Sequence, residues 1–140
     1  MKVVLDTNVV LDLVVFHEPG AAPLLNAIES GRATVLARLD CLDELRRVLA
    51  YPRFRLDAAA QATALQWLVN RAELATAESP SVVLPRCRDA DDQKFLELAW
   101  TTQADFLVTK DNALLVLARR IAKLGRFTVS LPTDLPLRSG

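Results

Sequence analysis

The chain opens with three apolar β-formers, Val3 to Leu5, that lead directly into Asp6, and the apolar pattern resumes at Val9-Val10-Leu11. A short continuous apolar run predicts a strand buried on both faces, which is typical of a parallel sheet. Thr7 and Asn8 follow Asp6, and either side chain can cap a helix. Because ligands bind at the carboxyl edge of open α/β sheets, Asp6 is the first candidate for a functional residue.

Strand and helix patterns alternate along the rest of the chain. We expect strands at 2–5, 33–37, 105–109 and 127–131, with either a strand or an extended connection at 82–84. We expect helices at 7–15, 23–29, 40–50 (capped by Asp40), 57–77 (capped by Asp57), 90–102 and 111–124, the last ending at Gly125. This order predicts the α/β class: three α/β/α layers around a mainly parallel sheet. Residues 1–135 are expected to form a single domain and 136–140 a tail.

Composition narrows the range of functions. The chain carries 17 Lys and Arg against 17 Asp and Glu, so nucleic-acid binding would have to come from local patches. Its two cysteines, Cys41 and Cys87, form no disulfide framework and favour a reducing, cytoplasmic setting. A strand at the N-terminus predicts no signal peptide. The longest apolar run, Val9 to Phe16, contains Asp12 and is too short to span a bilayer.

Two acids follow apolar strands. Asp6 ends the first strand, and Asp111 follows the apolar run Phe106-Leu107-Val108 after Thr109 and Lys110. If both strands are parallel and central, Asp6 and Asp111 meet at the same edge of the sheet. Asp111 also suits the N-cap of the next helix, and the two roles are compatible.

Helix periodicity identifies Glu44 as a third candidate acid for the same site. At 100° per residue, Glu44 borders the apolar stripe of its helix beside Val48, so it can face Asp6 along the edge of the sheet. Asp43 falls on the opposite side and is expected to face water. The stripe itself consists of Leu42, Leu45, Val48 and Leu49.

Helix periodicity also identifies Asp92 as a fourth candidate acid for the site. It lies on the inward stripe of its helix, one turn before Leu96, where an acid is costly unless it is paired or coordinated. The helix N-terminus favours its ionised form. Asp89 and Asp91 lie off this stripe and are expected to act as caps or as outer partners of the site.

Four neighbouring carboxylates, from Asp6, Glu44, Asp92 and Asp111, repel one another unless a cation lies between them. Oxygen ligands without His or Cys suit Mg²⁺ or Mn²⁺ rather than Zn²⁺. Such an ion positions a water molecule, lowers its pKa and offsets the charge that develops on a phosphate. The four acids therefore predict phosphodiester hydrolysis.

These segments resemble the four motifs of the PIN domain family. The motif-like segments are 4–9 (VLDTNV), 43–49 (DELRRVL), 87–99 (CRDADDQKFLELA) and 105–111 (DFLVTKD). The resemblance extends from Val3 to about Leu135. It is closest to the VapC-like subgroup, the toxins of bacterial type II toxin–antitoxin pairs.

The resemblance implies a five-stranded parallel sheet and an endoribonuclease that uses one or two Mg²⁺ or Mn²⁺ ions. It also implies a homodimer and a partner antitoxin that covers or disrupts the acidic site. Carried onto this chain, Asp6, Glu44, Asp92 and Asp111 are the metal-binding and catalytic acids. Asn8 and Thr109 hold Asp6 and Asp111 in place.

This chain departs from the family pattern at two positions. Many relatives carry another Asp two positions after the fourth acid, where this chain has Ala113, so a second metal ion is less well supported. A small hydroxyl residue usually precedes the helix of the second acid, but here the sequence reads Ala37-Arg38-Leu39-Asp40. The four main acids are unaffected by both departures.

Basic residues near these acids have two interpretations. Arg46 and Arg47 follow Glu44, and Lys110 precedes Asp111, so all three can contact an RNA backbone or form solvated surface. Lys110 is the best single candidate. Other basic residues open to the same two interpretations are Arg53, Arg55, Arg86, Arg88 and Lys94.

Trp67 and Leu74 lie opposite the main apolar stripe of their helix. They are expected to pack under another helix, with an exposed patch for a dimer or antitoxin as the alternative.

Two other functions remain to be compared with a ribonuclease. One is a non-catalytic module of the same fold that binds RNA or protein, which would be favoured if the chain bound no metal. The other is a phospho-acceptor receiver domain, which usually has an acidic pair after strand one. Thr7 and Asn8 stand there instead, so the receiver interpretation is disfavoured.

Overall fold

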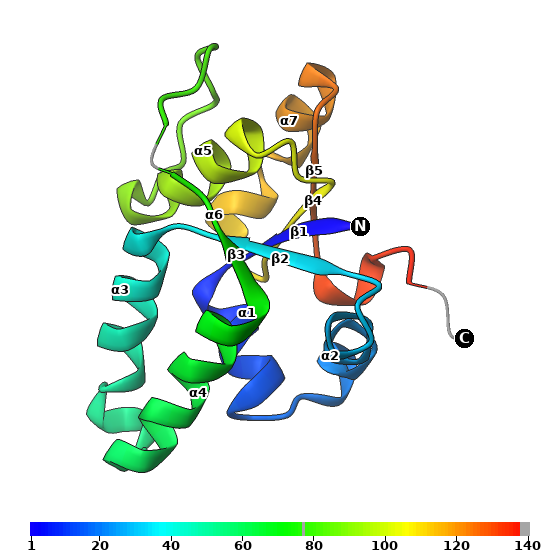
Figure 1. Ribbon diagram of the computed structural model, residues 1–140. Helices are drawn as coiled ribbons and strands as arrows, with labels where there is room; N and C mark the ends of the chain where they lie inside the picture. The colour runs from blue at the N-terminus through cyan, green and yellow to red at the C-terminus, as the bar shows by residue number, and fades with distance from the viewer. Residues whose placement is uncertain (77, 138–140) are drawn as a thin grey trace.

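The computed structural model describes residues 1–76 and 78–137, which form a five-stranded sheet flanked by helices (Figure 1). All strand pairs are parallel, and the order across the sheet is β3-β2-β1-β4-β5. Central β1 pairs Val4 with Leu36 of β2 and with Leu107 of β4. The strands are β1 (Lys2–Leu5), β2 (Thr34–Ala37), β3 (Ala72–Leu74), β4 (Phe106–Val108) and β5 (Thr128–Ser130). The predicted α/β class and parallel sheet are confirmed.

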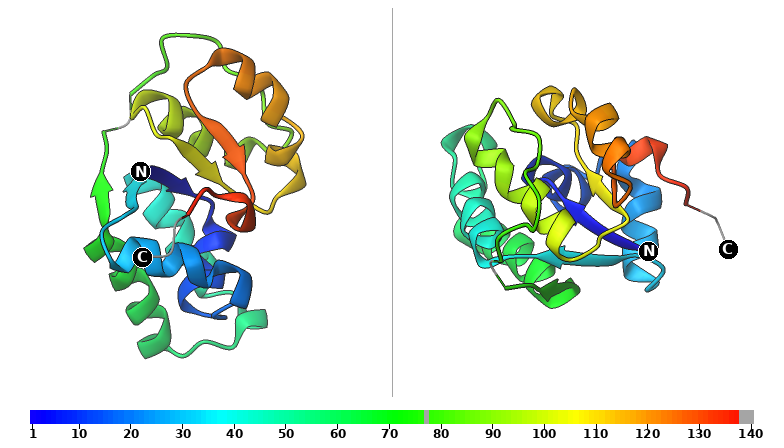
Figure 2. Two further views of the ribbon diagram at one scale, coloured as in Figure 1. Left: turned by 90° about the vertical axis from the view of Figure 1, so that its right-hand side faces the viewer. Right: turned by 90° about the horizontal axis from the view of Figure 1, so that it is seen from above.

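Helices cover both faces of the sheet, as the views in Figures 1 and 2 show. One face carries α1 (Thr7–Val14), α2 (Ala22–Glu29), α3 (Leu39–Leu49) and α4 (Ala58–Arg71). The opposite face carries α5 (Gln93–Thr101), α6 (Asn112–Leu115) and α7 (Ala118–Leu124). Short 3₁₀ turns lie at η1 (Pro19–Ala21), η2 (Pro52–Phe54), η3 (Ala90–Asp92) and η4 (Pro132–Asp134).

The period-two geometry of β1 supplies a core to each layer of helices. Val3 packs with the α1–α4 layer, whereas its neighbour Val4 packs with the α5–α7 layer. Both side chains are fully or almost fully buried, because successive residues of a strand point to opposite faces. An apolar strand covered on both sides is what the opening sequence predicts.

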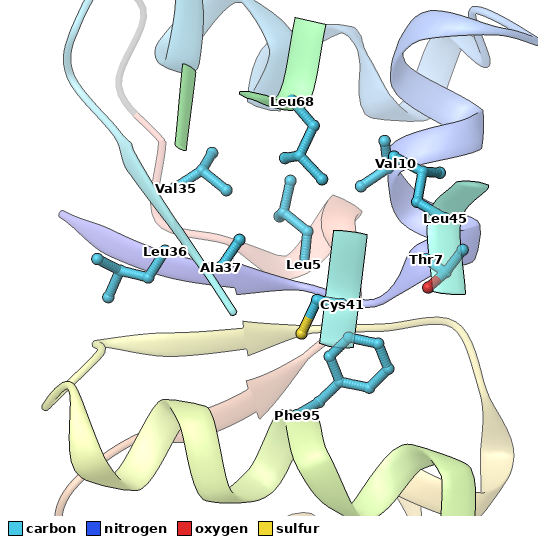
Figure 3. Close-up of a pocket in the computed structure, with 10 residues that line it drawn as sticks. All are labelled: Leu5, Thr7, Val10, Val35, Leu36, Ala37, Cys41, Leu45, Leu68 and Phe95. Atoms are coloured by element: carbon cyan, nitrogen blue, oxygen red, sulfur yellow. The ribbon is translucent and has the colours of Figure 1, made fainter. Parts of the chain in front are cut away.

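A small cavity, shown in Figure 3, is lined by residues of both cores. Its volume of about 10 Å³ is at the lower limit for a single water molecule. The lining is apolar apart from Thr7, with Leu5 and Leu68 pointing toward each other across it. This cavity is a packing feature and not a ligand site.

The end of the fourth helix was predicted incorrectly. α4 ends at Arg71, and Ala72–Leu74 form edge strand β3, in which Ala72 pairs with Val35. Pairing with β2, which is distant in the sequence, takes precedence here over the local helix pattern. Residues 82–84 form no strand: Val82 lies in a bend, and the two residues after it have no regular secondary structure. Ala77, the predicted end of the helix, and 138–140 of the predicted tail lie outside the described residues.

Two predicted helix caps differ in the structure, whereas Asp57 does cap α4 through the backbone NH of Ala60 at 2.7 Å. Asp6 occupies the N-cap position of α1 without a side-chain cap bond, so neither Thr7 nor Asn8 is the cap. Asp40 lies inside α3 and pairs with buried Arg38 at 2.5 Å. A buried guanidinium needs an ionic partner, and this requirement takes precedence over capping at Asp40.

The helix predicted at 111–124 is divided into α6 and α7. The Leu117 backbone NH bonds to the Leu114 carbonyl at 3.0 Å, and this three-residue bond tightens the chain between the two helices. Leu114 and Leu117 are both buried as a result. Gly125 ends α7 with φ of 74°, the left-handed conformation that the predicted stop requires.

Among the described residues, none of the helices combines the length and the apolar character that a membrane span requires.

We expect both thiols to be unreactive in the folded protein. Cys41 and Cys87 are buried and free, and burial raises the pKa of the Cys41 thiol to about 11. Because the thiolate is the reactive form, a disulfide reagent at about pH 8 should modify neither cysteine quickly. Both should react once guanidinium unfolds the chain. Fast stoichiometric labelling of the native protein would contradict this packing.

Candidate functional site

The carboxyl ends of the two central strands place Asp6 and Asp111 at one edge of the sheet. Asp6 follows β1, and its backbone NH extends the pairing by donating to the Val108 carbonyl of β4 at 3.0 Å. Asp111 follows β4 and caps α6, because its Oδ1 accepts from the Ala113 backbone NH at 2.9 Å. Both roles expected of Asp111, strand-end acid and helix cap, are therefore present together.

Thr109 connects these two acids. Its hydroxyl donates to Asp6 Oδ2 at 2.8 Å and accepts from the backbone NH of Asp111 at 2.9 Å. The side chain is fully buried, so water does not compete for these bonds. Asn8 is exposed, and within residues 1–76 and 78–137 the side chain that hydrogen-bonds the Asp6 carboxylate is Thr109, not Asn8.

Three carboxylates approach closely enough to share a cation. Asp89, Asp92 and Asp111 each offer an oxygen, and these oxygens lie within 4.8 Å of one another. Asp89 is oriented by the Asp91 backbone NH, which donates to its Oδ1 at 3.0 Å. Asp92 is only 7% exposed, and its Oδ2 has no hydrogen-bond partner among the residues that the structure describes. A buried oxygen in this state is costly unless something cationic or a proton satisfies it.

Electrostatics reflect this crowding. Burial raises the pKa of Asp92 to about 8, assisted by the Asp111 carboxylate, which accepts a hydrogen bond only from the protonated form. The charges of Asp6, Asp111 and Asp89 act in the same direction. Burial also raises the pKa of Asp6, against the lowering effect of the Thr109 hydrogen bond. Like charges that raise one another's pKa in this way favour a bound cation.

Glu44 lies beside this group but is held by other partners. Its Oε1 pairs with Lys94 Nζ at 2.6 Å, and its Oε2 accepts from the Thr7 hydroxyl. Both side chains of the ion pair are 13% exposed. Glu44 is close enough for its charge to raise the pKa of Asp6, yet it is not one of the three clustered carboxylates. Asp43 is exposed and pairs with Arg46, as helix phase predicts.

The sequence predicts Asp89 as a cap or an outer partner of the site, and Asp89 does cap η3. Its place among the three clustered carboxylates was not predicted. A usable signal existed, because Asp89 and Asp92 are three residues apart and a single turn of helix brings such residues to one side. The Lys94–Glu44 pair had no signal in the sequence, since it joins side chains 50 positions apart.

The three basic residues predicted to contact RNA differ in their exposure and in their ion-pair partners. Arg46 is 64% exposed and engaged by Asp43, and Arg47 is exposed on the same helix. Lys110 forms an ion pair with Asp12 of α1. Trp67 is half-buried and donates to Glu29 of α2 at 2.7 Å, which agrees with packing against another helix. The same prediction is wrong for Leu74, which lies in edge strand β3 and is 59% exposed.

The donor set fits a hard divalent cation. Carboxylate oxygens without nitrogen or sulfur partners suit Mg²⁺ or Mn²⁺, and the unpartnered Asp92 Oδ2 is an oxygen that such an ion would satisfy. Asp92 and Asp111 are the central candidates to hold the ion, with Asp89 on the solvent side and Asp6 on the strand side.

Comparison with known proteins identifies the family. Residues 2–113 match the family model described as the PIN domain. No curated protein sequence matches the chain. Among solved structures, the chain is similar to one from VapBC2 of Rickettsia felis, crystallised with a DNA fragment from its promoter. The two structures align with a TM-score of 0.61 and 13% sequence identity. The alignment covers 94% of this chain and 98% of the other. At this low identity the likeness shows a shared fold only. With a matching family model over most of its length, the chain belongs to the PIN domain family.

Proposed function

We propose that this protein is a metal-dependent endoribonuclease that hydrolyses RNA phosphodiester bonds with Mg²⁺ or Mn²⁺. The observation that carries the proposal is the group of Asp89, Asp92 and Asp111, with its buried and unpartnered Asp92 oxygen. Family membership supports it, since these acids stand in the segments that resemble the PIN motifs. We assign the nuclease to a single domain, residues 1–135, followed by a short tail.

The roles of the residues follow from their contacts. A bound Mg²⁺ or Mn²⁺ would supply an acidified water and offset charge on the phosphate. Asp92 and Asp111 would hold the ion, with Asp89 beside them. Thr109 fixes the Asp6 carboxylate and the Asp111 backbone relative to each other. Glu44, held by Lys94 and the Thr7 hydroxyl, adds negative charge at the border of the site and is a candidate ligand only if it leaves Lys94.

We further propose that the enzyme is the toxin of a bacterial toxin–antitoxin pair, acting in the cytoplasm as a homodimer. Two observations support this: the VapC-like motifs of the sequence and the likeness in fold to a VapBC2 chain. The partner would be an antitoxin protein that covers the acidic edge of the sheet. Co-expression with the product of a small adjacent gene, followed by purification, tests the pairing.

The decisive test of the enzymatic proposal is cleavage of a structured RNA by the purified protein with Mg²⁺ or Mn²⁺. Activity should disappear in excess EDTA and return when the metal is restored. Cleavage that persists in EDTA and in both the Asp6→Asn and Asp92→Asn variants would point to a contaminating nuclease. Intact folding with no metal binding by calorimetry would favour a non-catalytic binding module.

Thr109→Val should lower the cleavage rate by about 10- to 100-fold, as loss of a partner that orients a metal ligand typically does. Valine keeps the shape of threonine but cannot donate to Asp6 or accept from Asp111. The cost in stability should be about 1–3 kcal/mol, because two buried polar groups lose their partner. Thr109→Ser keeps the hydroxyl and serves as the control; its rate should stay near that of the wild type. Equal losses in both variants would show that packing, not the hydroxyl, matters.

A further inference from the structure

A groove with a volume of about 440 Å³ adjoins the acidic site. One side comes from α1 and the residues after it, another from η2, and the third from the segment after β4. The groove reaches the site itself, because Asp111 lines both. Its lining consists of Asn8, Leu11, Asp12, Phe16, Arg53, Phe54, Lys110 and Asp111.

We infer that this groove binds one unpaired nucleotide of the substrate RNA, its base against Phe16 and Phe54 and its phosphate beside Arg53. The inference rests on the proposed ribonuclease function and names how the substrate is held. A strand lying in the groove would carry its neighbouring phosphate past Asp111, toward the three clustered carboxylates.

The aromatic residues form a surface suited to a base. The ring centroids of Phe16 and Phe54 are 5.6 Å apart, and Tyr51 stacks near Phe54 with centroids 6.2 Å apart. Phe16 is 45% exposed and Tyr51 is 43% exposed, so the rings form one accessible aromatic patch. Proteins that hold single-stranded nucleic acid stack its bases on such rings.

Arg53 supplies the positive charge of the groove. Its guanidinium carbon lies 4.9 Å from the Phe54 ring centroid and 5.3 Å from that of Tyr51. These cation–π contacts orient the side chain, and within residues 1–76 and 78–137 no carboxylate forms an ion pair with Arg53. Lys110, by contrast, is paired with Asp12. Arg53 is therefore the groove cation that is available to a phosphate.

The size and the lining of the groove fit a nucleotide. A volume of about 440 Å³ is within the range of small-ligand pockets, roughly 300–1,000 Å³. Aromatic rings with a free guanidinium match a base and its phosphate, and the exposed Asn8 amide can hydrogen-bond a base edge.

The test measures RNA affinity without cleavage. The full-length Asp92→Asn chain is titrated in EDTA against a fluorescein-labelled single-stranded oligoribonucleotide, with anisotropy as the readout. When Phe54→Ala is introduced into this Asp92→Asn chain, RNA binding should weaken about 5- to 150-fold, which is the effect of losing one base stack. Adding Arg53→Gln should weaken binding less and lower the salt dependence by about one phosphate contact.

Two further variants keep the test conclusive. Phe16→Ala removes an exposed ring, so it should weaken binding even if Phe54→Ala disturbs folding. Arg119→Gln changes an exposed arginine of α7, outside the groove, and should leave binding unchanged. Unchanged affinity in the groove variants, or an equal loss with Arg119→Gln, would overturn the inference; unchanged affinity would leave the groove to a protein partner.

Failure of this inference can be told apart from failure of the proposed function. A wild-type protein that cleaves RNA, with the same KM in Phe16→Ala and Arg53→Gln, contradicts the groove assignment only. A protein that binds single-stranded RNA through the groove but cleaves none with Mn²⁺ contradicts the ribonuclease proposal only.

Discussion

Asp92→Asn is expected to lower RNA cleavage by more than about 100-fold, because even residues that merely orient a metal ligand cost about 10- to 100-fold when lost. Asp92 is the most buried of the three clustered acids, and its Oδ2 has no other partner among the described residues. Asparagine keeps the shape of the side chain but removes the negative charge. Single-turnover cleavage with saturating Mn²⁺ measures the loss.

The same substitution should stabilise the metal-free protein. Asp92 has a pKa raised from 3.8 to about 8, so the folded chain holds this proton more tightly than the unfolded chain does. The protonated Asp92 stabilises the fold fully when the pH is below 3.8, the pKa of this carboxyl in the unfolded chain. This stabilisation is lost as the pH rises toward the folded pKa of about 8. The asparagine side chain cannot ionise, and its amide can donate to Asp111. At about pH 8 the gain should be on the order of 1–3 kcal/mol.

Urea unfolding in EDTA at several pH values measures this gain. The difference in free energy of unfolding between Asp92→Asn and wild type should grow from about pH 5 to about pH 8 and then level off. A variant that is both inactive and less stable across the whole range would mean that Asp92 supports the fold instead of the reaction.

Mn²⁺ is expected to raise the melting temperature of the wild-type protein markedly. An ion that binds only the folded state stabilises it by about 2.7 kcal/mol at 100 times its Kd, or roughly 10 °C for a chain of this size. The physical source is relief of repulsion among Asp89, Asp92 and Asp111. Differential scanning fluorimetry across a Mn²⁺ titration measures the shift.

Calorimetry should find one Mn²⁺ per chain. Lys94 already neutralises Glu44, and Ala113 offers no further carboxylate near Asp111. Asp111→Asn should abolish the thermal shift. Asp43→Asn is the matched control, because Asp43 is an exposed acid of α3 that pairs with Arg46. A shift that survives Asp111→Asn but not Asp43→Asn would locate the ion elsewhere.

Local pattern was sufficient for most of the fold. The apolar runs at β1, β2, β4 and β5 each formed a strand, and their alternation with helices specified a parallel sheet. Asp57 and Gly125 marked helix ends because capping and left-handed backbone are short-range effects. Strand ends and helix phase also located Asp6, Asp92 and Asp111 on surfaces that face one another.

Other features depended on distant partners. The sequence of β3, Ala-Glu-Leu, has a low intrinsic preference for strands. It forms a strand through its parallel backbone pairing with β2. Asp40 was predicted to be a helix cap, but in the structure it forms an ion pair with buried Arg38. Neither outcome is visible in a window of neighbouring residues, since each is set by which groups the folded chain leaves without a partner.

Hydrophobic periodicity and strand ends are local properties, so they are enough to predict a parallel α/β sheet with acids at its carboxyl edge. The folded structure, by contrast, sets how those acids are grouped. It grouped Asp89 with Asp92 and Asp111 and gave Glu44 to Lys94. It also made Thr109 the link between Asp6 and Asp111. The physical reason is the short range of these contacts, because ion pairs and hydrogen bonds form only between groups a few ångströms apart. Which side chains come that close is set by the packing of helices and strands that are distant in the sequence.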